Sequence, residues 1–218
     1  MVKKGFIFDL DGVIVDTASY HYLAWKKLAE SIGVSFSEEQ NEQLKGVSRV
    51  RSLEKILAWG NKEISQDLFM ELMAKKNQDY LDYVSKMTEA EILPDVTRVL
   101  NFLQELQQGV ALGSASKNAR NILKKVMLID HFEAIVDGTD VTKAKPDPEV
   151  FLKAAELLSI SPNNCIVFED SVAGIQAANS AGMISIGIGS SSVLHEADHV
   201  FSDFTQMSKD FMNNLIIK

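Results

Sequence analysis

Two aspartates follow the first apolar run of the chain, in the stretch FIFDLDG. If this run is a β-strand, its period of two places Asp9 and Asp11 on one side and Leu10 on the other. Ligands of parallel sheets gather where strands end, so paired carboxylates here are typical of a chemical site. An Asp before a Gly is equally typical of a polar turn. The stretch alone leaves both interpretations open.

A second acid pair, Glu169 and Asp170, follows the apolar run CIVF. Acids near a helix start are also favoured by the helix dipole, which is the alternative interpretation. Four carboxylates at one sheet edge would repel one another without a compensating cation. Carboxylate oxygens are the ligands that Mg²⁺ prefers, together with water and substrate phosphate oxygens. We therefore expect Mg²⁺ as the cofactor.

Hydroxyl, amide and lysine side chains follow two other apolar segments. Backbone N–H groups at a helix start after a strand can bind a phosphate, although Ser and Asn are also ordinary helix caps there. After a third segment Pro148 is expected in a first helical turn, with Asp147 as its cap. Lys143 is expected to be a solvated surface charge. The candidates are Ser114, Ser116, Lys117 and Asn118 in GSASKN, and Lys145 in KAKPDP.

The hydrophobic pattern predicts an α/β protein. Residues 5–8 and 13–15 are short apolar and β-branched segments, which indicate a buried strand followed by a turn at Gly12. Helical patterns alone then fill residues 17–92, and beyond Pro94 helices alternate with short apolar strands. The predicted helices are 17–33, 37–44, 50–59, 65–86, 95–108, 119–128, 148–158 and 172–181, and the later strands are 110–113, 134–136, 165–168 and 184–188, before a weakly patterned tail.

Alternation of strands and helices predicts a Rossmann-like core, with a mainly parallel sheet flanked by helices. The first strand belongs to this sheet, so the helical block is predicted to be an inserted α-helical cap domain. The expected domains are residues 1–16 and 93–218 for the discontinuous catalytic core, and 17–92 for the cap. Thr17 is the expected N-cap of the first cap helix, which Gly33 ends. His21 lies on its apolar stripe, where a buried structural histidine and a role near the hinge are both open.

Composition limits the classes of function. The 218 residues carry a formal charge of -8 and 46% are hydrophobic, so no global basic field exists for nucleic acid or anionic lipid. No apolar stretch approaches the length of a membrane span, and Asp9 interrupts the first one. The single Cys165 lies in an apolar run and is expected to be a buried thiol. We expect a soluble, cytoplasmic protein that is a monomer or weak dimer.

The order DLDG, GSASKN, KPDP and FEDS resembles the haloacid dehalogenase superfamily of phosphoryl-transfer enzymes over the whole chain. The resemblance implies that Asp9 is the nucleophile and Asp11 the general acid/base. It further implies that Ser114 and Lys145 hold the transferring phosphoryl group. The implied Mg²⁺ ligands are Asp9, the backbone carbonyl of Asp11, Glu169 and Asp170.

The cap contains a more specific motif, LKGVSRVRSLEKIL. A helix starting near Arg49 would place Arg49 and Ser52 on one face, ahead of the inward residues Leu53 and Ile56, although a surface arginine is the simpler interpretation. With His21 and GSASKN, the motif is similar to the sugar phosphomutases of the superfamily. This resemblance implies a sugar phosphate bound by Gly46, Val47 and Arg49 from the cap and by Ser116, Lys117 and Asn118 from the core, with Lys45, Ser52 and Lys76 as second-rank candidates.

The resemblance implies interconversion of β-glucose 1-phosphate and glucose 6-phosphate through a bisphosphate, with a small sugar phosphate as the only partner. A sugar-phosphate phosphatase of the same superfamily and a non-catalytic sugar-phosphate-binding protein are the alternatives. Two positions depart from the pattern. Asp95 stands where relatives often carry glycine and is expected to change only a helix cap. Arg51 adds a charge beside the specificity loop and is expected to bear on the choice of sugar.

Overall fold

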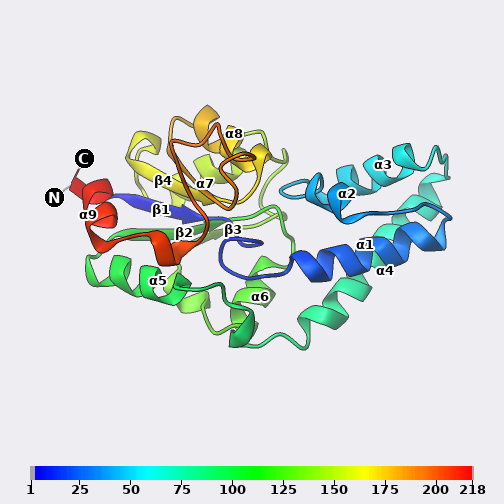
Figure 1. Ribbon diagram of the computed structural model, residues 1–218, viewed down its shortest axis with the longest axis horizontal. Coiled ribbons are helices and arrows are strands. Elements are labelled where there is room, and N and C mark those ends of the chain that lie inside the picture. The colour runs from blue at the N-terminus through cyan, green and yellow to red at the C-terminus, as the bar shows by residue number, and fades with distance from the viewer. Residues whose placement is uncertain (1–2, 218) are drawn as a thin grey trace.

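The computed structural model describes residues 3–217, which form an α/β lobe and a helical lobe (Figure 1). Within this range the sheet has the strand order β3-β2-β1-β4-β5-β6 and every pairing is parallel. This is the order of a doubly wound Rossmann-like sheet, so the predicted fold class is confirmed. The strands are β1 Gly5–Phe8, β2 Gly109–Gly113, β3 Ala134–Val136, β4 Cys165–Glu169, β5 Ile184–Ile188 and β6 His199–Phe201.

The helices divide between the two lobes. Four belong to the helical lobe: α1 Ala18–Ser31, α2 Glu38–Glu42, α3 Arg49–Trp59 and α4 Gln66–Val84. Those of the α/β lobe are α5 Val96–Glu105, α6 Ala119–Lys125, α7 Glu149–Leu157, α8 Val172–Ser180 and α9 Lys209–Ile217. Short 3-10 helices cover Glu89–Glu91, Ile129–His131, Pro162–Asn164 and Phe204–Gln206. None of the helices described between residues 3 and 217 is both long and apolar enough to cross a bilayer.

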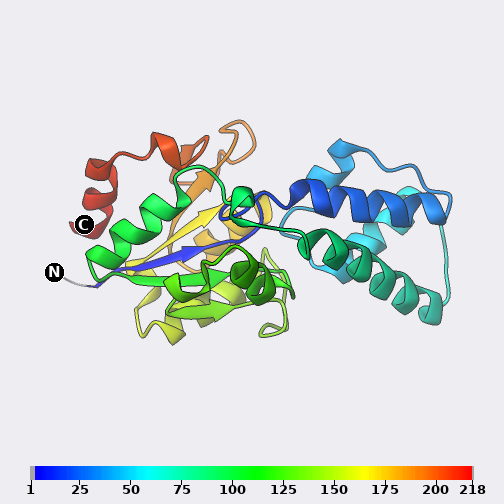
Figure 2. The same cartoon turned by 90° about the horizontal axis from the view of Figure 1, so that it is seen from below.

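Both faces of the sheet are buried, because successive residues of each strand point to opposite sides. Phe6 and Phe8 of β1 pack into a cluster with residues of α5, α6 and α9. Ile7 faces the other way and packs with Phe151 of α7 and Ala177 of α8. Figure 2 shows α5 and α9 on one side of the sheet and α7 on the other. Because both faces of the sheet are buried, the strands are continuous apolar runs in the sequence.

Strand β1 lies at the centre of the sheet, between β2 and β4. Because the three strands are parallel, the segments after them meet at one edge of the sheet. The amide of Asp9 donates to the carbonyl of Phe168 at 3.0 Å, which extends the pairing one residue beyond β1. The residues after β1, β2 and β4 are therefore neighbours at the topological switch point, where ligands of such sheets bind.

The helical lobe has its own apolar cluster, which includes Trp25, Leu28, Leu53 and Ile56. Serines cap α2, α3 and α4. Ser37 forms a capping box with Gln40, and the Ser48 and Ser65 side chains accept hydrogen bonds from backbone amides at the starts of α3 and α4. The lobe thus has an apolar core separate from that of the sheet.

Two chain segments connect the lobes, and they lie side by side. Residues 13–15, which the pattern assigned to a strand, form no strand of the sheet. Val15 instead makes an isolated bridge to Ile92, and the amide of Leu93 donates to Ile14 at 3.0 Å. The apolar character of these residues reflects burial in the core, not pairing with β1. This was a wrong prediction, since periodicity cannot separate a buried turn from a strand.

Other differences lie at element ends and in the tail. Strand β6 and helix α9 were not predicted, because β6 is a three-residue edge strand with no clear alternation. Pro148 is the N-cap of α7 and not part of its first turn, while Asp147 does cap by accepting from the Glu149 amide at 3.0 Å. Asp95 has φ of 63°, where glycine is the usual residue, and it pairs with Arg98 at 2.8 Å.

Candidate active site

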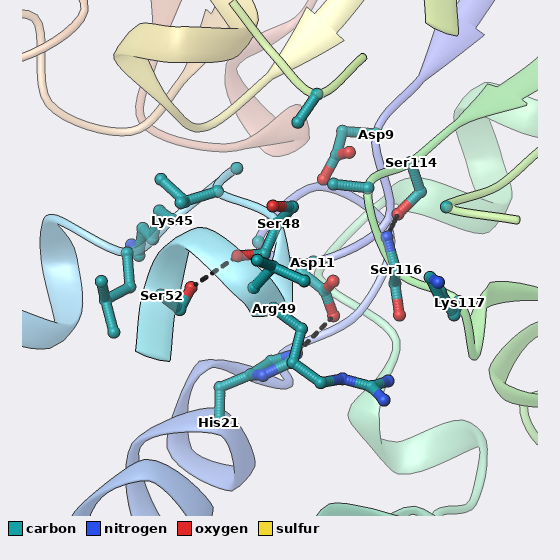
Figure 3. A pocket seen from close by; sticks show the side chains of 18 of the residues that line it. Asp9, Asp11, His21, Lys45, Ser48, Arg49, Ser52, Ser114, Ser116 and Lys117 are labelled. Atoms are coloured by element: carbon teal, nitrogen blue, oxygen red, sulfur yellow. Dashed lines mark hydrogen bonds and ion pairs between the residues drawn. The ribbon is translucent and has the colours of Figure 1, made fainter. Parts of the chain in front are cut away.

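A cavity of about 420 Å³ lies between the two lobes. The core contributes the residues that follow strands β1, β2 and β3, together with Asp170. The cap contributes residues of α1, of the segment before α3 and of α3 itself (Figure 3). The sequence candidates that line it are Asp9, Asp11, Lys45, Gly46, Val47, Arg49, Ser52, Ser114, Ser116, Lys117 and Asp170, with His21 and Lys143 beside them.

Asp9 and Lys145 form a buried ion pair at the floor of this cavity. The Lys145 ammonium lies 2.6 Å from Asp9 Oδ1 and 2.5 Å from Glu169 Oε1, and it donates to the Gly113 carbonyl at 3.1 Å. Lys145 is 5% exposed and Asp9 is 6% exposed. Lys145 therefore fixes the position of the Asp9 carboxylate and offsets part of its charge.

Burial dominates the electrostatics of this floor. Desolvation raises the pKa of Asp9, and the neighbouring Glu169, Asp11 and Asp170 raise it further, while Lys145 opposes the shift. Burial alone would lower the pKa of Lys145, but Asp9 and Glu169 outweigh it and the net shift is upward. Lys145 thus stays charged, and further positive charge near Asp9 would favour the ionised form of its carboxyl group.

Asp11 lies at the seam between the lobes, close to groups of the cap. Its Oδ1 accepts a short hydrogen bond from the Thr17 hydroxyl, and His21 Nε2 lies 3.8 Å from the same oxygen. Burial raises the pKa of Asp11, which the Thr17 hydrogen bond partly opposes. Thr17 occupies the predicted N-cap position of α1, but its side chain makes no cap hydrogen bond there. Its hydroxyl donates to Asp11 instead, and the sequence did not predict this contact.

Lys76 lies behind His21 and does not line the cavity. Its ammonium is 2.9 Å from His21 Nδ1 and faces the rings of Trp25 and Tyr80 at 4.5 and 4.8 Å. Burial, with the nearby Arg49 charge, lowers the pKa of Lys76 to about 7. The same burial lowers the pKa of His21. The structure therefore places Lys76 as a partner of His21 and not in direct contact with the cavity.

The variant Lys76→Met is expected to reduce the pH dependence of stability. The unfolded lysine has a pKa of about 10.4, so between pH 7 and 9.5 the unfolded chain binds more protons than the folded one. The unfolding free energy of the native protein should then rise between pH 7 and 9.5. This rise should exceed that of the Lys76→Met variant by on the order of 3 kcal/mol. Urea unfolding across this range measures the difference. Lys75→Met, at an exposed neighbouring position, is the control. If the unfolding free energies of the native protein and of Lys76→Met change with pH in parallel, the expectation is contradicted.

Hydrogen bonds between its own residues hold the segment after β2, residues 114–118, in a turn beside the cavity. Ser114 Oγ accepts from the Ser116 amide at 3.1 Å, and Ser116 Oγ accepts from the Asn118 amide at 3.3 Å. Ser114 is 1% exposed. Asn118 does not line the cavity: its Nδ2 donates to Oδ1 of Asn77 on α4 at 3.0 Å. The structure thus places Asn118 as a contact between core and cap.

The cap segment before α3 approaches the core closely. Gly46 has φ of 69°, and a Cβ at this position would meet Ser171 Oγ at 2.5 Å, so only glycine permits the approach. Lys45 pairs with Glu42 at 2.9 Å and reaches Asp170 at 3.4 Å. Ser52 is 2% exposed and its hydroxyl donates to the Ser48 carbonyl at 3.1 Å.

Arg49 enters the cavity from the first turn of α3. Within residues 3–217 no carboxylate lies within ion-pairing distance of its guanidinium, whereas the neighbouring Arg51 is 73% exposed and pairs with Glu54 at 2.7 Å. Figure 3 shows Arg49 of the cap and Ser116 and Lys117 of the core in the same pocket. A half-buried arginine facing a cavity without a protein partner is suited to an anionic ligand.

The two acids at the end of β4, Glu169 and Asp170, lie in different surroundings. Asp170 lines the cavity, and the absence of a side chain at Gly12, with φ of 80°, leaves room for its carboxylate. Burial, and then the charge of Glu169, raise the pKa of Asp170 to about 7. Glu169 is fully buried and does not line the cavity. Its Oε1 accepts from Lys145, and its Oε2 accepts from the amide and hydroxyl of Ser171 at 2.8 and 2.9 Å.

The donor set fits Mg²⁺. Asp9 and Asp170 present carboxylate oxygens to one cavity. Burial, and then the charges of nearby carboxylates, raise the pKa of both groups, and a bound cation would oppose this shift. In the described part of the chain no three His, Cys, Asp or Glu side chains form a metal cage. Mg²⁺ does not require one, since it is held by one or two carboxylates plus waters and substrate phosphate.

A parallel sheet with acids at its central strand end, opposite a helical cap, is the arrangement of a phosphoryl-transfer enzyme. The chain belongs to the haloacid dehalogenase-like hydrolase family, whose model matches residues 3–182, and it is an enzyme of that family. The predicted superfamily is confirmed.

Two of the most similar proteins within this family are β-phosphoglucomutases. The chain is similar to the β-phosphoglucomutase of Bacillus subtilis strain 168, with 44% identity over 96% of this chain and 94% of that protein. The crystal structure of β-phosphoglucomutase from Clostridium difficile has a TM-score of 0.95 and 39% identity, covering 99% of this chain and 98% of that one. A phosphorylated carbohydrates phosphatase of Thermotoga maritima is 30% identical over 83% of this chain and 82% of that protein.

Proposed function

We propose that this protein is a Mg²⁺-dependent phosphomutase that interconverts β-D-glucose 1-phosphate and glucose 6-phosphate through glucose 1,6-bisphosphate. The observation that carries this proposal is a single cavity lined by Asp9, Ser114 and Ser116 of the core and by Arg49 of the cap, whose guanidinium pairs with no carboxylate within residues 3–217. A molecule with phosphates at both ends requires positive groups on both sides. The likeness to the β-phosphoglucomutases supports the proposal.

In the proposed first half-reaction, phosphorylated Asp9 transfers its phosphoryl group to the sugar. The C6 hydroxyl oxygen of β-glucose 1-phosphate attacks phosphorus, and the bond from phosphorus to the Asp9 oxygen breaks. Asp11 accepts the hydroxyl proton. Lys145 and Ser114 hold the transferring oxygens, while Arg49 binds the phosphate already on C1. The products are glucose 1,6-bisphosphate and free Asp9.

In the second half-reaction the bisphosphate is bound the other way round. Asp9 attacks the phosphorus on C1, the bond from phosphorus to the C1 oxygen breaks, and protonated Asp11 returns its proton to that oxygen. Glucose 6-phosphate leaves and Asp9 is phosphorylated again. The raised pKa of Asp11, caused chiefly by burial, supports this role, because an acid/base must exist in both protonation states near neutral pH.

Asp9, the backbone carbonyl of Asp11 and Asp170 are the residues that we propose to hold Mg²⁺. The resemblance also includes Glu169, whose oxygens accept from Lys145 and Ser171; in this proposal it acts on the ion through these neighbours. Bound Mg²⁺ offsets charge on the phosphoryl oxygens, so that a carboxylate can approach phosphorus. As part of the proposal, the activity belongs to the cytoplasm, where a single reduced Cys165 is ordinary.

The deciding experiment supplies β-glucose 1-phosphate, Mg²⁺ and a trace of glucose 1,6-bisphosphate. Glucose 6-phosphate is followed with a coupled dehydrogenase, and inorganic phosphate is measured in the same samples. We expect glucose 6-phosphate to accumulate well ahead of phosphate, and chelation of Mg²⁺ by EDTA to stop the reaction until excess Mg²⁺ is restored. Release of phosphate alone would identify a phosphatase and reject the mutase proposal.

A further inference from the structure

The loop between β3 and α7 forms one wall of the cavity. We call residues 137–144 the pocket loop. Gly138, Val141, Thr142, Lys143 and Ala144 line the cavity, and Lys145 follows directly. The position of this loop therefore bears on both the space for a substrate and the place of Lys145.

The pocket loop also touches the segment that follows β2. The Gly138 amide donates to the Ser116 carbonyl at 3.2 Å. A Cβ on Gly138 would collide with the backbone carbonyl of Ala115, so the two segments are in direct backbone contact. Movement of the pocket loop would consequently displace the groups proposed to bind phosphate.

Arg120, on α6, binds the first part of the pocket loop. Its Nε lies 3.1 Å from Asp137 Oδ2, and its Nη2 donates to Asp140 Oδ2 at 3.0 Å and to the Ile135 carbonyl at 2.7 Å. The Asp137 carboxylate is almost fully buried. Its other oxygen accepts from the amide and hydroxyl of Thr139 at 2.8 and 2.6 Å.

Helix α7 holds the second part of the pocket loop. The Glu149 carboxylate accepts from the Thr142 amide at 3.1 Å and from the Lys143 amide at 2.7 Å. Lys153 pairs with Glu149 at 2.7 Å and donates to the Asp140 carbonyl at 2.6 Å. Lys153 and these loop amides hold the pKa of Glu149 at about 2, so this attachment persists at any ordinary pH.

A single exposed ion pair contributes little, because solvent screens it. Arg120 differs, since one planar guanidinium bonds two carboxylates and a carbonyl, and one of those carboxylates is buried. The planar guanidinium fixes the orientation of its hydrogen-bond partners as well as stabilising them, and the ammonium of a lysine cannot do the same. We call residues 114–118 the phosphate segment. Helix α6 begins at Ala119, directly after this segment, and Arg120 is its second residue.

We propose that Arg120 is a positioning residue that fixes the pocket loop against the phosphate segment and thereby sets the geometry of Lys145 and the bound phosphoryl group. For its effect on the sugar phosphate, the proposal rests on the proposed function. Its effect on the phosphoryl position does not depend on the sugar, because Asp9, Ser114 and Lys145 would hold the phosphoryl group whether the acceptor is a sugar or water. Arg120 contacts no substrate in this role.

The test compares Arg120→Gln with Arg98→Gln. Arg98 is the control, because its guanidinium also binds three groups, one carboxylate and two backbone carbonyls, and it does not line the cavity. These partners are Asp95, Phe204 and Met207. We expect similar losses of thermal stability in both variants. Arg120→Gln alone should raise KM for the sugar phosphate about tenfold, since small misplacements of binding groups have effects of that order or more. Arg120→Lys should restore the charge but not the KM.

A second measurement keeps the proposal independent of the substrate. Beryllium fluoride with Mg²⁺ mimics a phosphoryl group on a carboxylate, and its affinity is measured by calorimetry on the same proteins. We expect weaker binding to Arg120→Gln than to Arg98→Gln. If the native protein shows no mutase activity, the proposed function fails while this comparison still stands. Equal KM and equal analogue affinity in both variants would overturn the role of Arg120.

Discussion

Replacing Asp9 by Asn is expected to lower turnover at least about a thousandfold, the order of loss found when an enzyme loses its covalent nucleophile. The amide oxygen is a poor nucleophile toward phosphorus, and the amide NH₂ cannot accept from the Lys145 ammonium 2.6 Å away. Asn keeps the shape of Asp, so the variant should fold. The measurement is the coupled assay, with intact mass spectrometry of the protein to detect phosphorylation.

The matched control is Asp130→Asn, at an exposed position outside the main cavity. It should keep native turnover. Circular dichroism melting should show that Asp9→Asn remains folded, since the substitution also removes a buried charge whose desolvation is costly. Retention of more than about a tenth of native turnover by a folded Asp9→Asn protein would exclude Asp9 as the covalent nucleophile.

Replacing Arg49 by Ala is expected to separate mutase from phosphatase behaviour. The bisphosphate loses the cap group that binds its second phosphate, so conversion to glucose 6-phosphate should fall by about a hundredfold, the size of effect typical of a lost charge-assisted contact. Hydrolysis of a small phosphoester such as p-nitrophenyl phosphate should change little, because Asp9, Asp11 and Lys145 are untouched. Both rates are measured on the same preparation.

Arg51→Ala provides the control on the same helix. Arg51 lies two residues away, carries the same charge and pairs with Glu54 on the exposed side of the cap. Equal loss of mutase activity in the two variants would indicate a general effect of cap charge and contradict a specific role for Arg49. Arg51 does not line the cavity. It therefore makes no direct contact through which it could influence the choice of sugar, as the sequence led us to expect.

Much of the core site was predictable because its residues come directly after strands. Parallel pairing brings the segments after β1, β2 and β4 to one edge, so Asp9, Ser114 and Asp170 had to be neighbours once the strands were recognised. Local patterns also predicted α3 and the inward position of Leu53 and Ile56. These inferences need only periodicity and the topology of parallel sheets.

Side-chain partners over long distances were not predictable in the same way. Thr17 looked like a helix cap but bonds Asp11, Asn118 looked like a phosphate ligand but bonds Asn77, and Lys76 lies behind His21. The first two contacts cross the seam between the lobes, and the third joins α4 to α1 within the helical lobe. No local sequence pattern encodes any of these three pairings. The same holds for Arg120, whose role depends on a loop that follows the next strand.

By itself, the sequence determined the alternation of strands and helices in the core, the helical insertion, and which acidic and basic residues follow each strand, because hydrophobic periodicity and residue spacing are local properties. The order of the strands in the sheet is a property of the tertiary structure. The tertiary structure decided which oxygens of the acid cluster are free. Asp170 faces the cavity, while both oxygens of Glu169 are occupied by Lys145 and Ser171. Among residues 3–217 it also left the Arg49 guanidinium without a carboxylate partner, because packing of the cap on the core directs this side chain into the cavity and Arg51 away from it.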